Sequence, residues 1–161
     1  MSEDPDEPEP SGYLEPTPPG VVTAWGVAGL VCGYLVHPLS ESLRGTALLV
    51  SWVQPAALLL LAITVGTTAW HTWRTVHVRR ERLEPHQAVN RLVLGRASAL
   101  VGALVAGGYA GYAVSWIGSE AELAGQRMLR SALAAVCALL VVVAGLLLER
   151  ACRVRKGPPE P

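Results

Sequence analysis

Three charged side chains stand at the margins of long apolar segments. Arg91 and Arg96 open the segment RLVLGRASALVGALVAGGYAGY, and Glu149 directly follows ALLVVVAGLLL. Arg96 lies about four residues inside its segment, roughly 6 Å along a helix. A charge near lipid is costly unless it finds a partner or extends to the interface. The sequence leaves both interpretations open: Arg91 or Arg96 pairs with Glu149, or the arginines snorkel toward the headgroups.

The residue types that most often carry catalysis or bind metals are few and poorly spaced. Three histidines between residues 71 and 86 lie six and nine positions apart, which is not the i, i+4 spacing of helical metal ligands. The three cysteines form no CxxC pair. The chain also has no GxSxG, HExxH, Walker or dinucleotide motif. We therefore expect no enzymatic activity, no metal site and no cofactor.

Small residues recur at every fourth position of the segment that carries Arg96. This helix-packing face consists of Gly95, Ala99, Ala103, Gly107 and Gly111. Small-xxx-small steps let another helix approach closely, which matters in lipid because packing drives helix association there. At about 100° per residue, Ala103 and Gly107 fall within roughly 20° of Arg96. Arg96 is therefore expected to point toward a packed face, either within the bundle or against a partner.

Four apolar segments long enough to cross a bilayer divide the chain, which has 161 residues, 51% of them hydrophobic. Segments of about 17 to 25 apolar residues are typical of transmembrane helices. We expect spans at about residues 21–36, 46–70, 92–117 and 129–148. The predicted fold class is all-α, an integral membrane bundle of four transmembrane helices.

The predicted membrane domain, residues 21–150, lies between two polar tails. Residues 1–20 contain six acidic residues, six prolines and no base. This composition cannot bury a core, and it predicts a disordered acidic, Pro-rich tail. The absence of bases also argues against a cleavable signal peptide. Residues 151–161 are expected to form a basic and then Pro-rich C-terminal tail.

The basic residues are segregated to one side of the predicted bundle. Ten of the 13 lie in or beside the loop between the second and third spans, or in the C-terminal tail. The positive-inside rule then predicts a multi-pass protein of the plasma (cytoplasmic) membrane, with N and C termini in the cytoplasm. The basic loop should attract anionic lipids, at about 1 kcal/mol per base. No basic surface interleaved with aromatic residues indicates nucleic-acid binding.

Two stretches of the chain resemble a known family of membrane proteins. The first, residues 83–112, includes Pro85, Arg91 and the motif RASA that begins at Arg96; the second, residues 148–154, contains ERxCRV. In these stretches the chain is similar to the actinobacterial membrane proteins grouped as domain of unknown function 3180 (DUF3180). The resemblance implies four spans over residues 21–154 and a membrane location. It implies no mechanism, because the family has no established activity.

Two classes of function fit these observations. The first is a non-enzymatic structural or accessory component of a membrane complex, whose partner is another membrane protein or a second copy of the chain. The alternative is a small transporter or channel component that works as an oligomer. Transport would require a polar lining, which Gln54, Thr64, Thr67 and Thr68 of the second span could supply, although such residues more often bond between helices. No span has an acidic residue near its middle, which counts against proton coupling.

Overall fold

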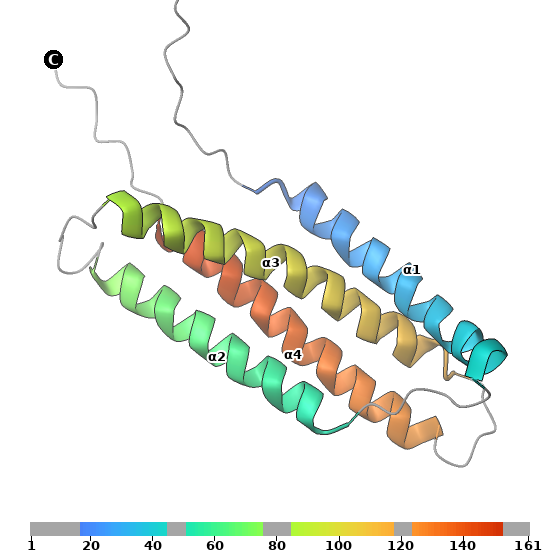
Figure 1. The fold of residues 1–161 in the computed structure, drawn as a ribbon. Helices are drawn as coiled ribbons and strands as arrows, with labels where there is room; N and C mark the ends of the chain where they lie inside the picture. The colour runs from blue at the N-terminus through green and yellow to red at the C-terminus, as the bar shows by residue number, and fades with distance from the viewer. Residues whose placement is uncertain (1–16, 45–50, 76–84, 118–123, 153–161) are drawn as a thin grey trace, which may run out of the picture.

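The computed structural model describes residues 17–44, 51–75, 85–117 and 124–152, and this part of the chain folds into helices without strands (Figure 1). The helices are α1 (Pro19–Arg44), α2 (Val53–Trp73), α3 (Pro85–Val114) and α4 (Ala124–Ala151). Each contains a segment long and apolar enough to cross a membrane. The predicted all-α fold with four potential membrane spans is confirmed.

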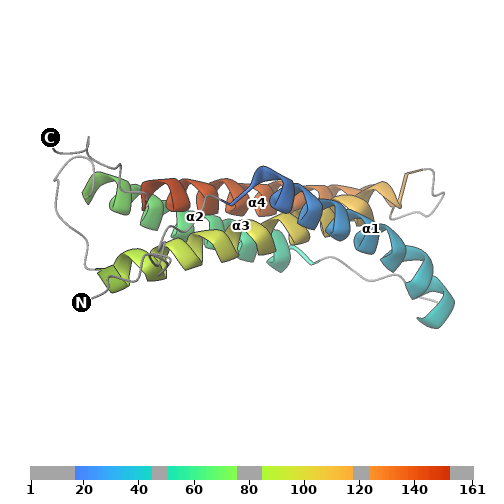
Figure 2. The ribbon, with the colours of Figure 1, turned by 90° about the horizontal axis from the view of Figure 1, so that it is seen from above.

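Proline marks the beginning of two helices. Pro19 and Pro85 are the first residues of α1 and α3, where the missing N–H costs nothing and the fixed φ suits the helix. The apolar part of α1 ends at Val36, as the sequence predicts, but the helix continues through Pro38 to Arg44. The far end of α1 therefore extends past the other helices (Figure 2).

Several boundaries differ from the sequence prediction. The sequence predicts that residues 17–20 belong to the disordered tail, but Thr17 is buried and α1 begins two residues later, while residues 18–20 are exposed. Helices α3 and α4 begin earlier than residues 92 and 129, because their first turns are polar and carry no apolar signal. Helix α3 ends at Val114, and residues 115–117 form a turn. The predicted tail segments 1–16 and 153–161, and residues 46–50 of the second span, lie outside the described residues.

The helices follow one another in space in the order α1, α3, α4, α2. The extensive contacts join α1 to α3, α3 to α4, and α4 to α2. Helices α1 and α3 run in one direction and α2 and α4 in the other, as Figure 1 shows. The two outer helices, α1 and α2, therefore each pack closely against a single neighbour.

The interior is built mainly from small side chains. Ala99, Ala134 and Ala138 are completely buried where α3 meets α4, and Leu148 is the largest side chain with no exposure. The large apolar side chains, such as Leu60 and Val101, point outward and remain exposed. This arrangement is the reverse of a soluble protein and suits a bundle surrounded by lipid, where close packing of small residues holds the helices together.

Candidate functional site

Glu149 is a buried carboxylate at the end of the bundle where α4 terminates. Only 5% of its surface is exposed. Its Oε1 accepts a hydrogen bond from the backbone N–H of Thr17 at 2.8 Å, and its Oε2 accepts one from the Thr17 hydroxyl, also at 2.8 Å. Thr17 precedes the first turn of α1. The two bonds therefore fasten the beginning of α1 to the end of α4, two helices that make few other contacts.

The two arginines predicted to act at this end lie close to Glu149 along the bundle axis. A Cβ added at Gly95 would lie 3.0 Å from the backbone nitrogen of Glu149, so α3 and α4 touch at this level. Arg91 donates a hydrogen bond of 3.2 Å to the hydroxyl of Thr72, which is fully buried on α2. Arg96 is half-buried. The bonds of Arg91 and Glu149 do not test the predicted pairing of Arg91 or Arg96 with Glu149, which stays a prediction.

Cys152 lies at the same end, directly after α4. Its thiol is free and half-buried. Burial raises the pKa of this thiol, and the positive charge of Arg91 partly opposes that rise. Cys152 therefore holds its proton more tightly than an exposed cysteine does, and the thiol is less reactive at neutral pH.

The five small residues of α3 face two different neighbours. Gly95 and Ala99 contact the backbone of α4 at Gly145, whereas Gly107 and Gly111 lie against the backbone of α1 at Gly26 and Leu30. Ala103 lies between these two groups, close to Gly26 of α1. Each step of four residues advances about 400°, so the row turns by roughly 40° per step around the helix. The first and last members of the row therefore cannot face the same neighbour.

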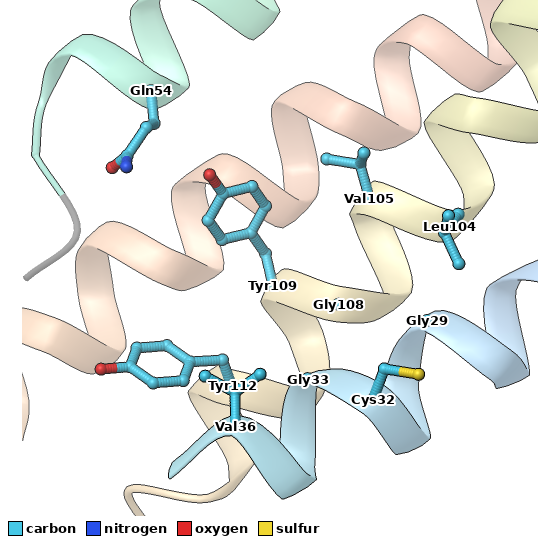
Figure 3. Close-up of a pocket in the computed structure, with 10 residues that line it drawn as sticks. All are labelled: Gly29, Cys32, Gly33, Val36, Gln54, Leu104, Val105, Gly108, Tyr109 and Tyr112. Atoms are coloured by element: carbon cyan, nitrogen blue, oxygen red, sulfur yellow. The ribbon is translucent and has the colours of Figure 1, made fainter. Parts of the chain in front are cut away.

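A groove of about 590 Å³ opens where α1, α3 and the beginning of α2 meet. Figure 3 shows its walls: the backbone of Gly29 and Gly33 on α1, the α3 residues around Gly108, and Gln54 reaching in from α2. Gln54, Tyr109 and Tyr112 are the most polar of the side chains that line it. The sequence singled out Gln54 as a polar residue of the second span, but it gave no sign that Gln54 would meet α1 and α3.

Aromatic and cationic side chains gather at the opposite end of the bundle from Glu149. The Arg127 guanidinium lies 4.8 Å from the centre of the Trp116 ring, and Arg130 lies 5.4 Å from that of Trp52. Trp116 also meets the edge of Tyr112. Such pairs combine cation–π attraction with the preference of tryptophan for the membrane interface. They join the beginning of α4 to Trp116, which follows α3, and to Trp52, which precedes α2.

Of the polar residues of α2, Thr72 meets Arg91, whereas Thr64, Thr67, Thr68 and Gln54 make other contacts or lie elsewhere on the helix. The hydroxyls of Thr64, Thr67 and Thr68 each donate to a backbone carbonyl of α2 itself. Gln54 lies at the other end of α2 from Thr72 and Arg91. Within the described part of the chain, no group of three or more histidine, cysteine or acidic residues could hold a metal ion.

Comparison with protein families places most of the chain in one of them. The model of the family described as "Protein of unknown function (DUF3180)" matches residues 22–156, most of the chain. The chain belongs to this family. No curated protein and no solved structure matches the chain.

The DUF3180 region contains every residue of the groove, together with the arginines of α3 and Glu149. Thr17, in contrast, lies before the matched region. The hydrogen bonds of Glu149 to Thr17 therefore join a position of the DUF3180 domain to the segment that precedes it. This junction joins residue 17, before the matched region, to α4 within it.

Proposed function

We propose that this DUF3180 protein is a non-enzymatic accessory component of a membrane complex, and that the outward face of α2 binds a transmembrane helix of the partner protein. The fold and the family match show a protein with four potential membrane spans that belongs to a family of unknown function. The partner and the binding face are our proposal. The proposed orientation places both termini in the cytoplasm, as the distribution of bases predicts.

The observation that carries the proposal is the two-sided character of α2. Its buried face, which includes Ala62, Val65 and Ala69, packs against α4. Thr64, Thr67 and His71 are exposed on the other side. At about 100° per residue, the two sets are centred roughly 160° apart. Helix α2 therefore presents threonines and a histidine on its outward face, beside large apolar residues such as Leu60.

Threonines suit a helix–helix interface in a membrane. The hydroxyls of Thr64 and Thr67 are bonded to the backbone of α2, so each side chain presents its methyl group and a short, satisfied hydroxyl. Small residues such as threonine are enriched at helix contacts in membranes because they allow close approach. Helix α2 packs closely against α4 alone, which leaves this face free of other described helices.

Site-directed photo-crosslinking in native membranes tests the proposal. A photoreactive benzoylphenylalanine is introduced in place of Thr67, on the outward face of α2. The matched control carries the same residue in place of Val143, which is exposed on α4. We expect irradiation to produce a specific adduct with one other protein from the Thr67 position and not from the Val143 position, and mass spectrometry identifies the partner.

Two results would contradict the binding of a different partner protein by α2. One is the absence of any protein adduct at Thr67 in membranes where the protein is folded and abundant. The other is an adduct with the mass of two copies of this chain, which would favour the alternative of an oligomeric transporter or channel component.

A further inference from the structure

The groove between α1, α3 and the beginning of α2 has the character of a ligand site. Its volume of about 590 Å³ lies within the range of small-molecule pockets, roughly 300 to 1,000 Å³. Gly108 contributes no side chain, and a Cβ added there would find its nearest neighbour, the carbonyl oxygen of Gly29, at 3.8 Å. A side chain at position 108 would therefore fit against α1 at an ordinary contact distance, and a large one could fill the groove.

One polar atom in this groove has an unmet hydrogen bond. Gln54 Oε1 is buried, and it accepts no hydrogen bond in the described part of the chain. A buried acceptor without a donor is costly, and the cost disappears when an occupant supplies an O–H or N–H group. The hydroxyl of Tyr109 reaches into the same groove from α3 (Figure 3). An occupant with a hydroxyl group could therefore bond to Gln54 and lie beside Tyr109.

The lining also limits the charge of the occupant. The described residues that line the groove are uncharged: Gly29, Cys32, Gly33, Val36, Gln54, Leu104, Val105, Gly108, Tyr109 and Tyr112. A phosphate headgroup would have no cation among them to neutralise it, and burying an unpaired charge is strongly unfavourable. This lining favours a neutral occupant.

Gln54, the polar residue of the groove, lies at the depth expected of a lipid headgroup. Gln54 is the second residue of α2, whose apolar span begins at Val53. From the level of Tyr112, the groove runs along α3 to Leu104, about 12 Å at 1.5 Å per residue. A molecule with its hydroxyl at Gln54 would extend its apolar chain from the interface toward the middle of the membrane.

We propose that the groove binds a neutral lipid with a free hydroxyl group, of the diacylglycerol class. The hydroxyl donates to Gln54 Oε1 and contacts the Tyr109 hydroxyl. One acyl chain lies over the glycine surface of α1 and α3. The lipid enters sideways from the bilayer, between α1 and α2, which are not in close contact. This site is independent of the outward face of α2.

Photolabelling of the purified full-length protein in lipid nanodiscs tests this assignment. Two probes carry the same diazirine acyl chain, one on diacylglycerol and one on phosphatidic acid. We expect the diacylglycerol probe to label the peptides that contain residues 29–36 or 104–112, and an excess of unlabelled diacylglycerol to compete. The phosphatidic acid probe should label these peptides at least about fivefold less, the factor that corresponds to about 1 kcal/mol.

Two variants locate the site. Gln54→Leu removes the acceptor and should reduce diacylglycerol labelling about fivefold or more. Gly108→Leu fills the groove and should abolish it. Val101→Leu, at an exposed position of α3 outside the groove, is the matched control and should label like the wild type. Equal labelling of the wild type by the two probes would overturn the proposal, as would unchanged labelling in both folded groove variants. Competition in the wild type tests the site even if a variant does not fold.

Discussion

The hydrogen bonds between Glu149 and Thr17 connect α1 to α4, two helices that make few other contacts. Glu149 is almost fully buried, so its charge depends on donors from the protein rather than on water. Thr17 supplies two of these donors from outside the matched family region. The segment before α1 therefore contributes directly to the environment of an acidic residue within the membrane domain.

Removing one of these donors should destabilise the protein measurably. Thr17→Val keeps the size of the side chain and loses the hydroxyl that bonds to Glu149. A hydrogen bond to a charged group contributes about 1.5–3 kcal/mol. We expect a lower thermal unfolding midpoint in detergent, with Glu149→Leu showing a similar or larger loss. Arg150→Gln, at the exposed neighbouring position, is the control and should change the midpoint little. A wild-type midpoint in Thr17→Val would contradict this role.

The pKa of Cys152 gives a prediction that depends on pH. The thiolate is the form that reacts with alkylating reagents, and burial raises the pKa of this thiol above its ordinary value. In a variant with Cys32 and Cys137 replaced by serine, we expect the alkylation rate to rise at a higher pH than in an unfolded peptide of the same sequence. Arg91→Met should shift the rise to still higher pH, because the arginine favours the thiolate. A rise at or below the pH of the peptide would contradict the burial.

The sequence predicts the end of the bundle at which the charged residues lie. It does not predict the atoms to which they bind. Placing Glu149 near the start of α3 required only the antiparallel order of the spans and the helical rise. Thr17 could not be found in the same way, because it lies in an acidic, Pro-rich segment with no apolar signal. Gln54 was noticeable as a polar residue next to Pro55. That it lines a groove with residues of α1 and α3 depends on the order of the helices in space, which no local pattern encodes.

At the scale of helices, the contact between α1 and α3 depends on glycine. A Cβ at Gly33, Gly107 or Gly111 would overlap backbone atoms of the neighbouring helix, which cannot move aside as a flexible side chain can. The two helices must therefore separate if any of these positions acquires a side chain. Gly125, in contrast, has open space around it.

This difference predicts opposite effects for two substitutions of the same kind. Gly107→Ala should destabilise the protein by about 1–3 kcal/mol, because overpacking a close contact forces the backbone to shift. Gly125→Ala should be neutral or stabilising by up to about 1 kcal/mol, because alanine is the better helix former and meets no neighbour. Thermal unfolding of both variants in one detergent compares them directly. Equal stability of the two would contradict the close approach of α1 and α3.

The apolar segments predict that helices exist and where their membrane parts lie, because length and hydropathy determine both. They do not predict the neighbours of each helix, because surfaces that face lipid and surfaces that face another helix are both apolar. The row from Gly95 to Gly111 illustrates this limit. Its spacing indicates close packing, whereas the division of the row between α4 and α1 depends on the turn of a straight helix and on the order of the helices in space.

At the scale of the whole molecule, both proposed binding sites follow from the order of the helices in space, α1, α3, α4, α2. A chain of pairwise contacts leaves two outer helices, one with threonines and a histidine on its outward face and one beside an open groove. Both features matter only if the four helices cross a membrane. The orientation of the bundle further decides whether the groove opens toward the cytoplasmic or the external leaflet.

The most direct test of this account is therefore the topology of the chain in the membrane. The three native cysteines are replaced by serine, and single cysteines are introduced by Ser2→Cys, Ser119→Cys or Glu160→Cys. We predict that a membrane-impermeant maleimide labels the Ser119→Cys variant in intact cells and labels the other two only after permeabilisation. Labelling of the Ser2→Cys or Glu160→Cys variant in intact cells would contradict a four-span protein with both termini inside.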